Sequence, residues 1–272
     1  MFLEILALRQ AIILAGCAAA AYTDTKTGLI FDKITYPMIA AGIILNIIEM
    51  NWLFLGIGAL VFATGYIFYY AGKIGGGDVK LYTGIAFLMP VLQGQSFLLN
   101  ALFASCILAV TFYSAYYTIK YAKKGIEWKE NRQATIKAIA FGTGIAVWLS
   151  ILAIAQFIAW QTLALLALPL MLAVLFLALE KGIRKNFFLR QISIHQLEED
   201  EVIAAEFLDE TTKKSLSLKL KGVFGEKEKR KLQSLGITTV PVYRDMPPFA
   251  PFIFLGAIAA MLQPDLLGLL FS

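Results

Sequence analysis

The sequence has very few side chains that bind metals or form disulfides: two cysteines and one histidine among 272 residues. Both cysteines, Cys17 and Cys106, lie inside apolar runs, so we expect neither a disulfide framework nor a Cys-x-x-Cys metal site. One histidine, His195, cannot form a zinc site by itself, and we interpret it as structural. The phosphate-binding pattern G-x-x-x-x-G-K-[ST] is also absent. We therefore predict that the protein uses no metal and no cofactor.

Charged residues are scarce as well, at 16% of the chain, whereas hydrophobic residues make up 59%. Such a chain is too apolar for a soluble fold and long enough for several membrane spans. Apolar runs predict about eight transmembrane helices, at residues 2–23, 34–50, 52–71, 79–92, 96–119, 135–158, 161–180 and 248–271.

The basic residues follow this predicted topology. With eight spans, all but one of the 24 Lys and Arg residues fall on the same side of the membrane, and the exception is Arg9. The positive-inside rule places that side in the cytoplasm of a multi-pass protein of the cell membrane, so both termini are expected outside. The net charge of +5 then reflects topology and gives no support to nucleic-acid binding.

Residues 181–247 are the only part with the patterning of a soluble protein. We predict strands at residues 202–207, 215–220 and 237–243 and a short helix at residues 226–235. The expected fold is thus an all-α polytopic membrane protein with a small cytoplasmic α+β module inserted before the last helix. Its three parts are a transmembrane catalytic domain (1–180), the module (181–247), and a final transmembrane helix packing back on the membrane domain (248–272).

Two aspartates lie at the ends of apolar runs. Asp24 follows the first span, and Asp78 comes after three glycines, Gly75, Gly76 and Gly77, just before the fourth. The topology puts both carboxylates at the cytoplasmic interface. Two carboxylates that share a site split their pKa values, so that one can activate water while the other donates a proton. The glycines would let a substrate backbone approach closely. This pattern predicts an aspartyl protease.

Other interpretations stay open at this point. The glycines can simply end the third span, with Asp78 as the N-cap of the next helix and Asp24 as an interfacial charge. A transporter could use the two aspartates as ion sites, and a non-enzymatic assembly protein would need them only for structure. Lys26 and Lys80 could tune the protonation of the pair, but we favour contacts with lipid headgroups.

The segment from Gly75 to Leu81 closely resembles the GxGD-x-K-[LM] motif of type IV prepilin peptidases and archaeal preflagellin peptidases, which are membrane aspartyl proteases. The segment from Asp24 to Pro37 is similar to that family's first-aspartate region. The stretch from Pro247 to Phe252 and the final apolar run look like the end of archaeal members. The resemblance implies that Asp24 and Asp78 are the catalytic pair and that their site faces the cytoplasm.

The resemblance also implies the substrates: prepilin or preflagellin precursors, whose short basic leader ends in Gly and precedes a hydrophobic helix held in the bilayer. The expected activity is endopeptidase removal of this leader. The sequence lacks the four-cysteine module of bacterial members, so we predict peptidase chemistry without amino-methylation. Presenilin-type proteases also use GxGD, but their Pro-Ala-Leu motif does not occur here.

Overall fold

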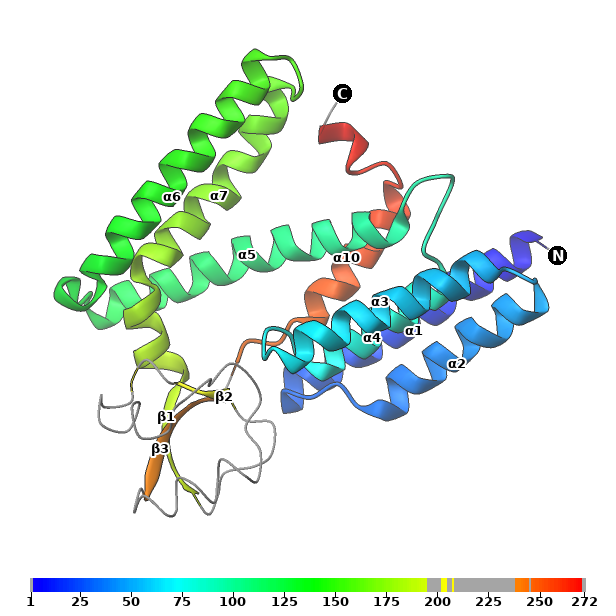
Figure 1. Ribbon diagram of the computed structural model, residues 1–272, viewed down its shortest axis with the longest axis horizontal. Coiled ribbons are helices and arrows are strands. Elements are labelled where there is room, and N and C mark those ends of the chain that lie inside the picture. The colour runs from blue at the N-terminus through cyan, green and yellow to red at the C-terminus, as the bar shows by residue number, and fades with distance from the viewer. Residues whose placement is uncertain (1, 195–201, 205–206, 208–237, 245, 271–272) are drawn as a thin grey trace.

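The computed structural model describes residues 2–194, 202–204, 207, 238–244 and 246–270. Long helices dominate this part of the chain, and each predicted apolar run corresponds to one of them. They are α1 (Phe2–Thr27), α2 (Asp32–Ile48), α3 (Trp52–Tyr70), α4 (Gly76–Leu88), α5 (Phe97–Lys124), α6 (Trp128–Ile154), α7 (Trp160–Ile183) and α10 (Ala250–Leu262) (Figure 1).

Five of these helices are long and apolar enough to cross a membrane: α1, α3, α5, α6 and α7, the last with its π-helical extension. The predicted class, an all-α polytopic membrane protein, is confirmed. The count of eight spans stays a prediction, because α2 has 17 residues and α4 and α10 have 13 each. At 1.5 Å per residue, α4 is only about 20 Å long, which is shorter than the roughly 30 Å hydrocarbon core of a bilayer.

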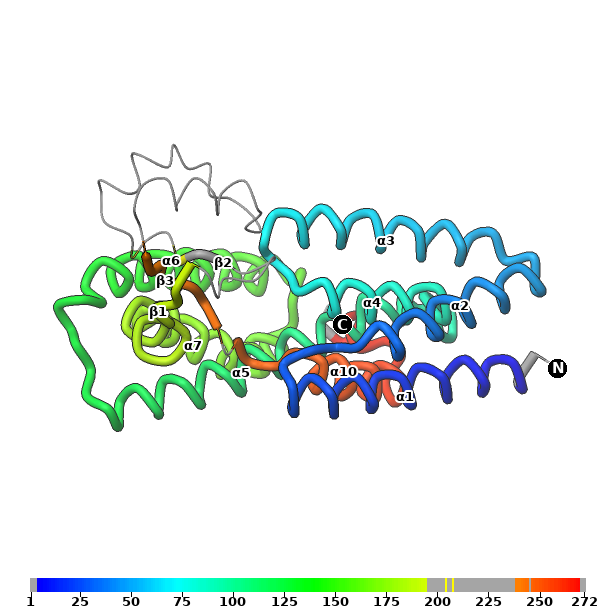
Figure 2. The backbone as a smooth tube through the Cα atoms, turned by 90° about the horizontal axis from the view of Figure 1, so that it is seen from below, coloured from blue at the N-terminus to red at the C-terminus, as the bar shows by residue number. Residues whose placement is uncertain are grey.

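The helices form a bundle and an extended arm (Figures 1 and 2). The short helix α4 packs against α1, α2 and α3, and α10 packs against α1 and α5. The hairpin of α6 and α7 joins the bundle through α5, which contacts α7. The main core lies between α1, α4, α5 and α10 and includes Ile13, Leu81, Ile85, Phe97 and Ile253. Helix α4, which begins within the glycine segment, is therefore the most enclosed of these helices.

Local sequence fixes several helix ends. The side chain of Asn51 accepts a hydrogen bond from the N–H of Phe54 at the start of α3, and Ser96 does the same for Leu99 at the start of α5. Helix α1 ends before Gly28, whose φ of 69° suits glycine and whose N–H reaches the carbonyl of Asp24 at 2.8 Å. The end of α1 just beyond Asp24 is thus set by a glycine.

A small antiparallel sheet follows α7 and a short π-helix, η1 (Arg184–Phe188). Its strands are β1 (Leu189–Ser193), β2 (Val202–Ile203) and β3 (Thr239–Tyr243), with β3 in the centre. The strands predicted at 202–207 and 237–243 are confirmed over these shorter ranges. We missed β1 because polar residues break its alternation, and it is held by pairing with β3. The strand predicted at 215–220, the helix predicted at 226–235 and His195 lie outside the described residues.

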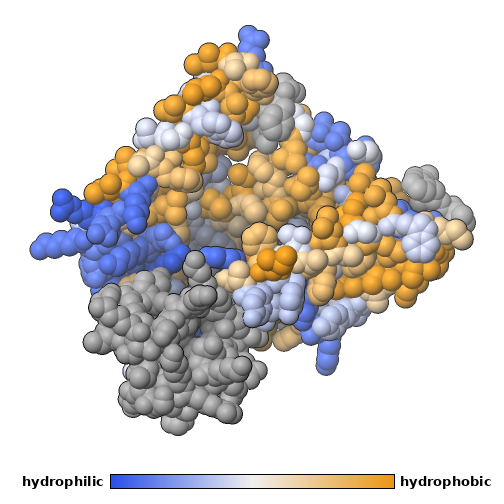
Figure 3. All heavy atoms as spheres, viewed as in Figure 1, coloured by the Kyte–Doolittle hydropathy of each residue, from blue (hydrophilic) through white to orange (hydrophobic). Residues whose placement is uncertain are grey.

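The outer surface of the helices is strongly apolar (Figure 3). On α6 alone, the side chains of Ile136, Phe141, Trp148 and Ile151 are each more than half exposed. Contiguous apolar surface of this size is unfavourable in water but suits the hydrocarbon of a bilayer. The exposure pattern agrees with the membrane class that the composition predicts.

Candidate active site

Asp24 lies in the last turns of α1, and its side chain is buried, with 7% exposure. One of its carboxylate oxygens, Oδ2, accepts a hydrogen bond of 2.9 Å from the backbone N–H of Ala250. Ala250 is the first residue of α10, where the helix dipole is positive and N–H groups are free. The Asp24 carboxylate thus lies at the start of α10 and meets a backbone donor there.

Asp78 lies in the first turn of α4, outside the five helices that are long enough to span. Burial, and then the charge of Asp24, raise the pKa of the Asp78 carboxyl from 3.8 to about 7. The two carboxyl groups are therefore near enough to interact, although 54 positions separate them in the sequence. A carboxyl group that keeps its proton near neutral pH can act as an acid, and a second carboxyl group near it can act as a base.

The interpretation of Asp78 as an N-cap is wrong. The N-cap of α4 is Gly75, which makes no side-chain cap bond, and Asp78 stands three residues further on, within the helix. Its carboxyl group folds back over Gly75, so that a Cβ at Gly75 would lie 3.0 Å from Asp78 Oδ2. The side chain of Asp78 is therefore not the N-cap of α4, and it lies over the glycine segment.

The glycine segment is a place of close approach. A Cβ at Gly77 would lie 2.8 Å from the Cβ of Ile30, and a Cβ at Gly76 would lie 3.2 Å from the ring of Tyr69. None of the three glycines has a positive φ. Glycine is therefore needed here because a side chain would not fit, and not because of an unusual backbone conformation. These contacts bring the start of α4 against the loop after α1 and the end of α3.

The two predicted supporting lysines differ in their surroundings. Lys80 Nζ forms an ion pair of 2.5 Å with Asp32 Oδ1 and lies 5.1 Å from the ring centroid of Tyr36. Both partners belong to the start of α2, so Lys80 joins the N-terminal end of α4 to α2 rather than standing alone at a headgroup layer. Lys26 is exposed at the end of α1.

The residues near Asp24 that we did not predict come from the end of the chain. The hydroxyl of Tyr113, on α5, donates a hydrogen bond of 2.5 Å to the carbonyl of Pro248. The ring of Tyr113 also packs edge-on against Phe252. Together these contacts hold the segment that presents the N–H of Ala250 to Asp24. Every residue type except proline has a backbone N–H, so no sequence pattern could indicate that the N–H of Ala250 would bind Asp24.

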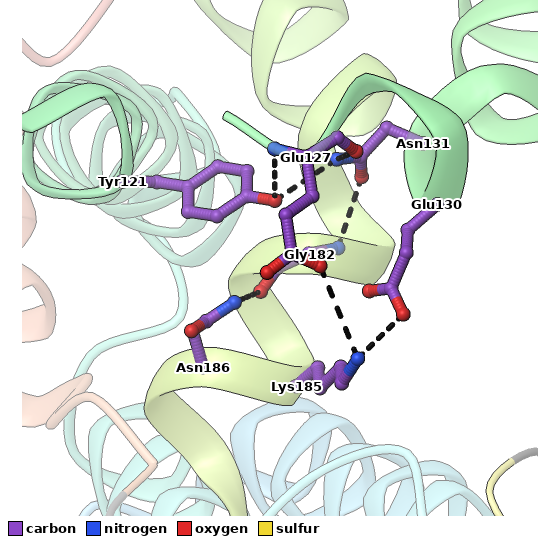
Figure 4. A network of polar contacts seen from close by, with 7 residues as sticks. All are labelled: Tyr121, Glu127, Glu130, Asn131, Gly182, Lys185 and Asn186. Carbon is purple, nitrogen blue, oxygen red and sulfur yellow. Dashed lines mark hydrogen bonds and ion pairs between the residues drawn. The ribbon is translucent and has the colours of Figure 1, made fainter. Parts of the chain in front are cut away.

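A separate polar network joins α5, α6 and α7 away from the aspartates (Figure 4). Asn131 donates to the hydroxyl of Tyr121 and accepts from the N–H of Gly182 at 2.9 Å. Lys185 pairs with Glu130 at 2.5 Å. A side chain at Gly182 would collide with the Tyr121 hydroxyl, so this network locks three helix ends together just before the sheet.

Neither a cluster of metal ligands nor the pocket between α6 and α7 accompanies the aspartates among the residues that the structure describes. Within the described parts of the chain, no three His, Cys, Asp or Glu side chains are grouped so that they could hold a metal ion. A cavity of about 550 Å³ lies between α6 and α7, with an apolar lining that includes Leu149, Leu170 and Met171. Its lining contains neither aspartate.

A comparison with known protein families finds a match over the region that carries both aspartates. The model of the type IV leader peptidase family matches residues 11–114. The resemblance predicted from the motifs around Asp24 and Asp78 is confirmed, because the matched residues contain both aspartates.

The chain is also similar to the prepilin peptidase EppA of Methanothermobacter thermautotrophicus, with 36% identity over 98 residues. The match covers 33% of this chain but only 25% of the relative. No solved structure matches the chain.

Proposed function

We propose that the protein is a membrane aspartyl endopeptidase that removes the short basic leader from prepilin-like or preflagellin-like precursors at the cytoplasmic face. The observation that carries the proposal is that the loop after α1 packs on the glycine segment, which brings Asp24 near enough for its charge to act on the Asp78 carboxyl group. Intramembrane carboxylates without a functional reason are costly and rare. The leader peptidase match and the relative described as a prepilin peptidase support the substrate class.

In the proposed reaction, ionised Asp24 takes a proton from a water molecule, and the water oxygen attacks the carbonyl carbon of the scissile peptide bond. Protonated Asp78 gives its proton to the carbonyl oxygen, which becomes a hydroxyl of the tetrahedral intermediate. The C–N bond then breaks as Asp24 gives the proton it took from water to the leaving nitrogen. Asp78 takes back a proton from a hydroxyl of the intermediate, and the leader keeps the new carboxyl group. The assignment rests on Asp78: burial favours the proton on that carboxyl group, so the role of base is given to Asp24.

The proposed substrate geometry follows from the same site. A precursor helix anchored in the bilayer would present the junction after its leader at the membrane surface, where the proposed pair lies. Anchoring removes much of the entropic cost of positioning the peptide. Residues 181–247, with the described strands β1 to β3, would form a module on the cytoplasmic side that leads into the segment beside Asp24.

Single asparagine exchanges test the proposal. Membranes containing wild type, Asp24→Asn or Asp78→Asn are incubated with a prepilin-like substrate that carries a basic leader and a Gly junction. We expect both variants to lose cleavage at normal protein levels. Asp265→Asn, which changes an exposed carboxylate beyond α10, is the matched control and should cleave as wild type does. Undiminished cleavage by either active-site variant removes that aspartate from the mechanism.

A further inference from the structure

Arg9 is the one basic residue that departs from the charge pattern of the loops, and the structure shows which groups its guanidinium contacts. Its side chain lies in the apolar helix α1 and is 3% exposed. Its guanidinium contacts Glu49 Oε2 and Asn46 Oδ1, both on or next to the end of α2 and both at 2.8 Å. Since a charge at membrane depth is costly, a paired and enclosed arginine calls for a function.

The same guanidinium reaches the C-terminal end of α4. Arg9 donates a hydrogen bond to the carbonyl of Leu88, and the side-chain amide of Asn46 donates one of 2.7 Å to the carbonyl of Phe87. The last carbonyls of any helix lack partners within the helix. Here Phe87 and Leu88 are buried, so their carbonyls depend on partners within the protein. A cation at this end also matches the negative pole of the helix dipole.

Helix α4 has Asp78 at its other end, ten residues away. Close packing couples the two ends: a Cβ at Gly42 of α2 would lie 2.8 Å from the backbone carbon of Phe87. Every residue from Thr83 to Leu88 is buried. A helix enclosed in this way moves as a rod, so a shift where it is held by Arg9 is carried to Asp78.

We propose that Arg9, together with Asn46 and Glu49, is a positioning site that anchors the C-terminal end of α4. It thereby sets the position of Asp78 relative to Asp24. The inference rests on the proposed function for its catalytic consequence. Stability alone is a weak reason for the cluster, because a buried ion pair is often no better than apolar residues of similar volume. Specifying one axial position of a short helix is a role that apolar side chains fill poorly.

The first test measures cleavage kinetics against pH for Arg9→Gln, Arg9→Lys and Glu49→Gln. We expect kcat to fall about tenfold to a hundredfold in Arg9→Gln, because displacements near 1 Å can cost about 10²-fold, with KM little changed. As Asp78 moves away from Asp24 and gains water, the alkaline limb of the rate profile should shift to lower pH. Arg9→Lys, which keeps the charge but not the forked geometry, should fall between wild type and Arg9→Gln.

The matched control is Asn100→Leu. Asn100 is also buried, and it joins the start of α5 to the segment after α10. Its side chain accepts a hydrogen bond from the N–H of Leu267 and donates one to the carbonyl of Pro264, and neither bond involves α4. We expect this variant to lose folded protein without changing the pH profile of what remains. The proposal is overturned if folded Arg9→Gln protein has the same kcat and the same pH profile as wild type. It is also overturned if Asn100→Leu changes kcat and the pH profile as Arg9→Gln does.

A second readout does not depend on catalysis. A Cβ at Gly65 of α3 would lie 3.4 Å from the Cβ of Val79 on α4, close to the 3.5–4.5 Å of a disulfide. In a Cys17→Ala, Cys106→Ala background, the pair Gly65→Cys and Val79→Cys should cross-link quickly under oxidation. Adding Arg9→Gln should slow this reaction severalfold, whereas adding Asn100→Leu should not.

The two readouts separate the two proposals. Slower cross-linking in a protein whose wild type cleaves no leader would support the anchor while refuting the peptidase function. Equal cross-linking rates with and without Arg9→Gln refute the anchor, whatever the protein cleaves.

Discussion

Replacing Asp78 by asparagine should make the protein more stable at alkaline pH while abolishing its proposed activity. Burial and the charge of Asp24 raise the pKa of Asp78 from 3.8 to about 7. The folded state therefore binds this proton more tightly than the unfolded chain does. As pH rises from about 4 to about 7, the wild type loses stability, because the unfolded state releases the proton first. Asparagine keeps the shape and does not titrate.

The size of the effect follows from the shift. From 3.8 to about 7 is roughly three units, and at 1.36 kcal/mol per unit this amounts to about 4 kcal/mol above pH 7. Asp78 is partly exposed, so solvent screening reduces the figure, and about 2 kcal/mol is the expected gain of the variant. For a chain of this length, that corresponds to roughly 4–8 °C in Tm at pH 8. The gain should shrink steadily toward pH 4.

The assay is thermal unfolding in detergent for wild type and Asp78→Asn between pH 4 and pH 8, with Asp265→Asn as the control for general charge effects. A difference in Tm that widens with pH for Asp78→Asn alone supports a carboxyl group held in place at a cost in stability. Equal or lower stability of Asp78→Asn at pH 8 refutes the reasoning and favours a structural role for this side chain.

Two further variants test how the site is supported. Gly77→Ala adds a Cβ that would lie 2.8 Å from Ile30; we expect kcat to fall about tenfold or more, and Ile30→Ala in the same chain to restore much of it. Tyr113→Phe removes the hydrogen bond that holds the segment beside Asp24; we expect a severalfold lower kcat, for a loss of about 1 kcal/mol. Tyr116→Phe, on the exposed side of α5, should leave kcat unchanged in the same cleavage assay, and a drop there equal to that of Tyr113→Phe would contradict the positioning role.

The helices could be predicted closely because bilayer-length apolar runs leave few other solutions. The ends of α3 and α5 even carry their own caps, Asn51 and Ser96. The short helix α4 shows the limit of hydropathy. Its run of apolar residues predicts a span to about residue 92, whereas the helix stops at Leu88, where Arg9 and Asn46 take over its carbonyl groups. Hydropathy contains no information about such a distant partner.

The candidate site divides in the same way. Residue types alone marked Asp24 and Asp78, because a carboxylate at the edge of an apolar run is rare enough to be noticed. The partner of Lys80 was missed, since Asp32 is an ordinary acidic residue at a helix start until folding brings it to 2.5 Å. Arg9 was visible only as an exception to a charge rule, and its contacts explain the exception.

The sequence by itself determined the membrane class, the positions of the helices and the identity of the two aspartates, because these depend on local composition and on which side chains a bilayer tolerates. Only the tertiary structure decided what surrounds the aspartates: the N–H of Ala250 on Asp24, the burial of Asp78, and the anchoring of α4 by Arg9. The physical reason is that these contacts use backbone groups and long-range packing. Every residue type has an N–H or a carbonyl to offer, so only the fold selects which ones meet.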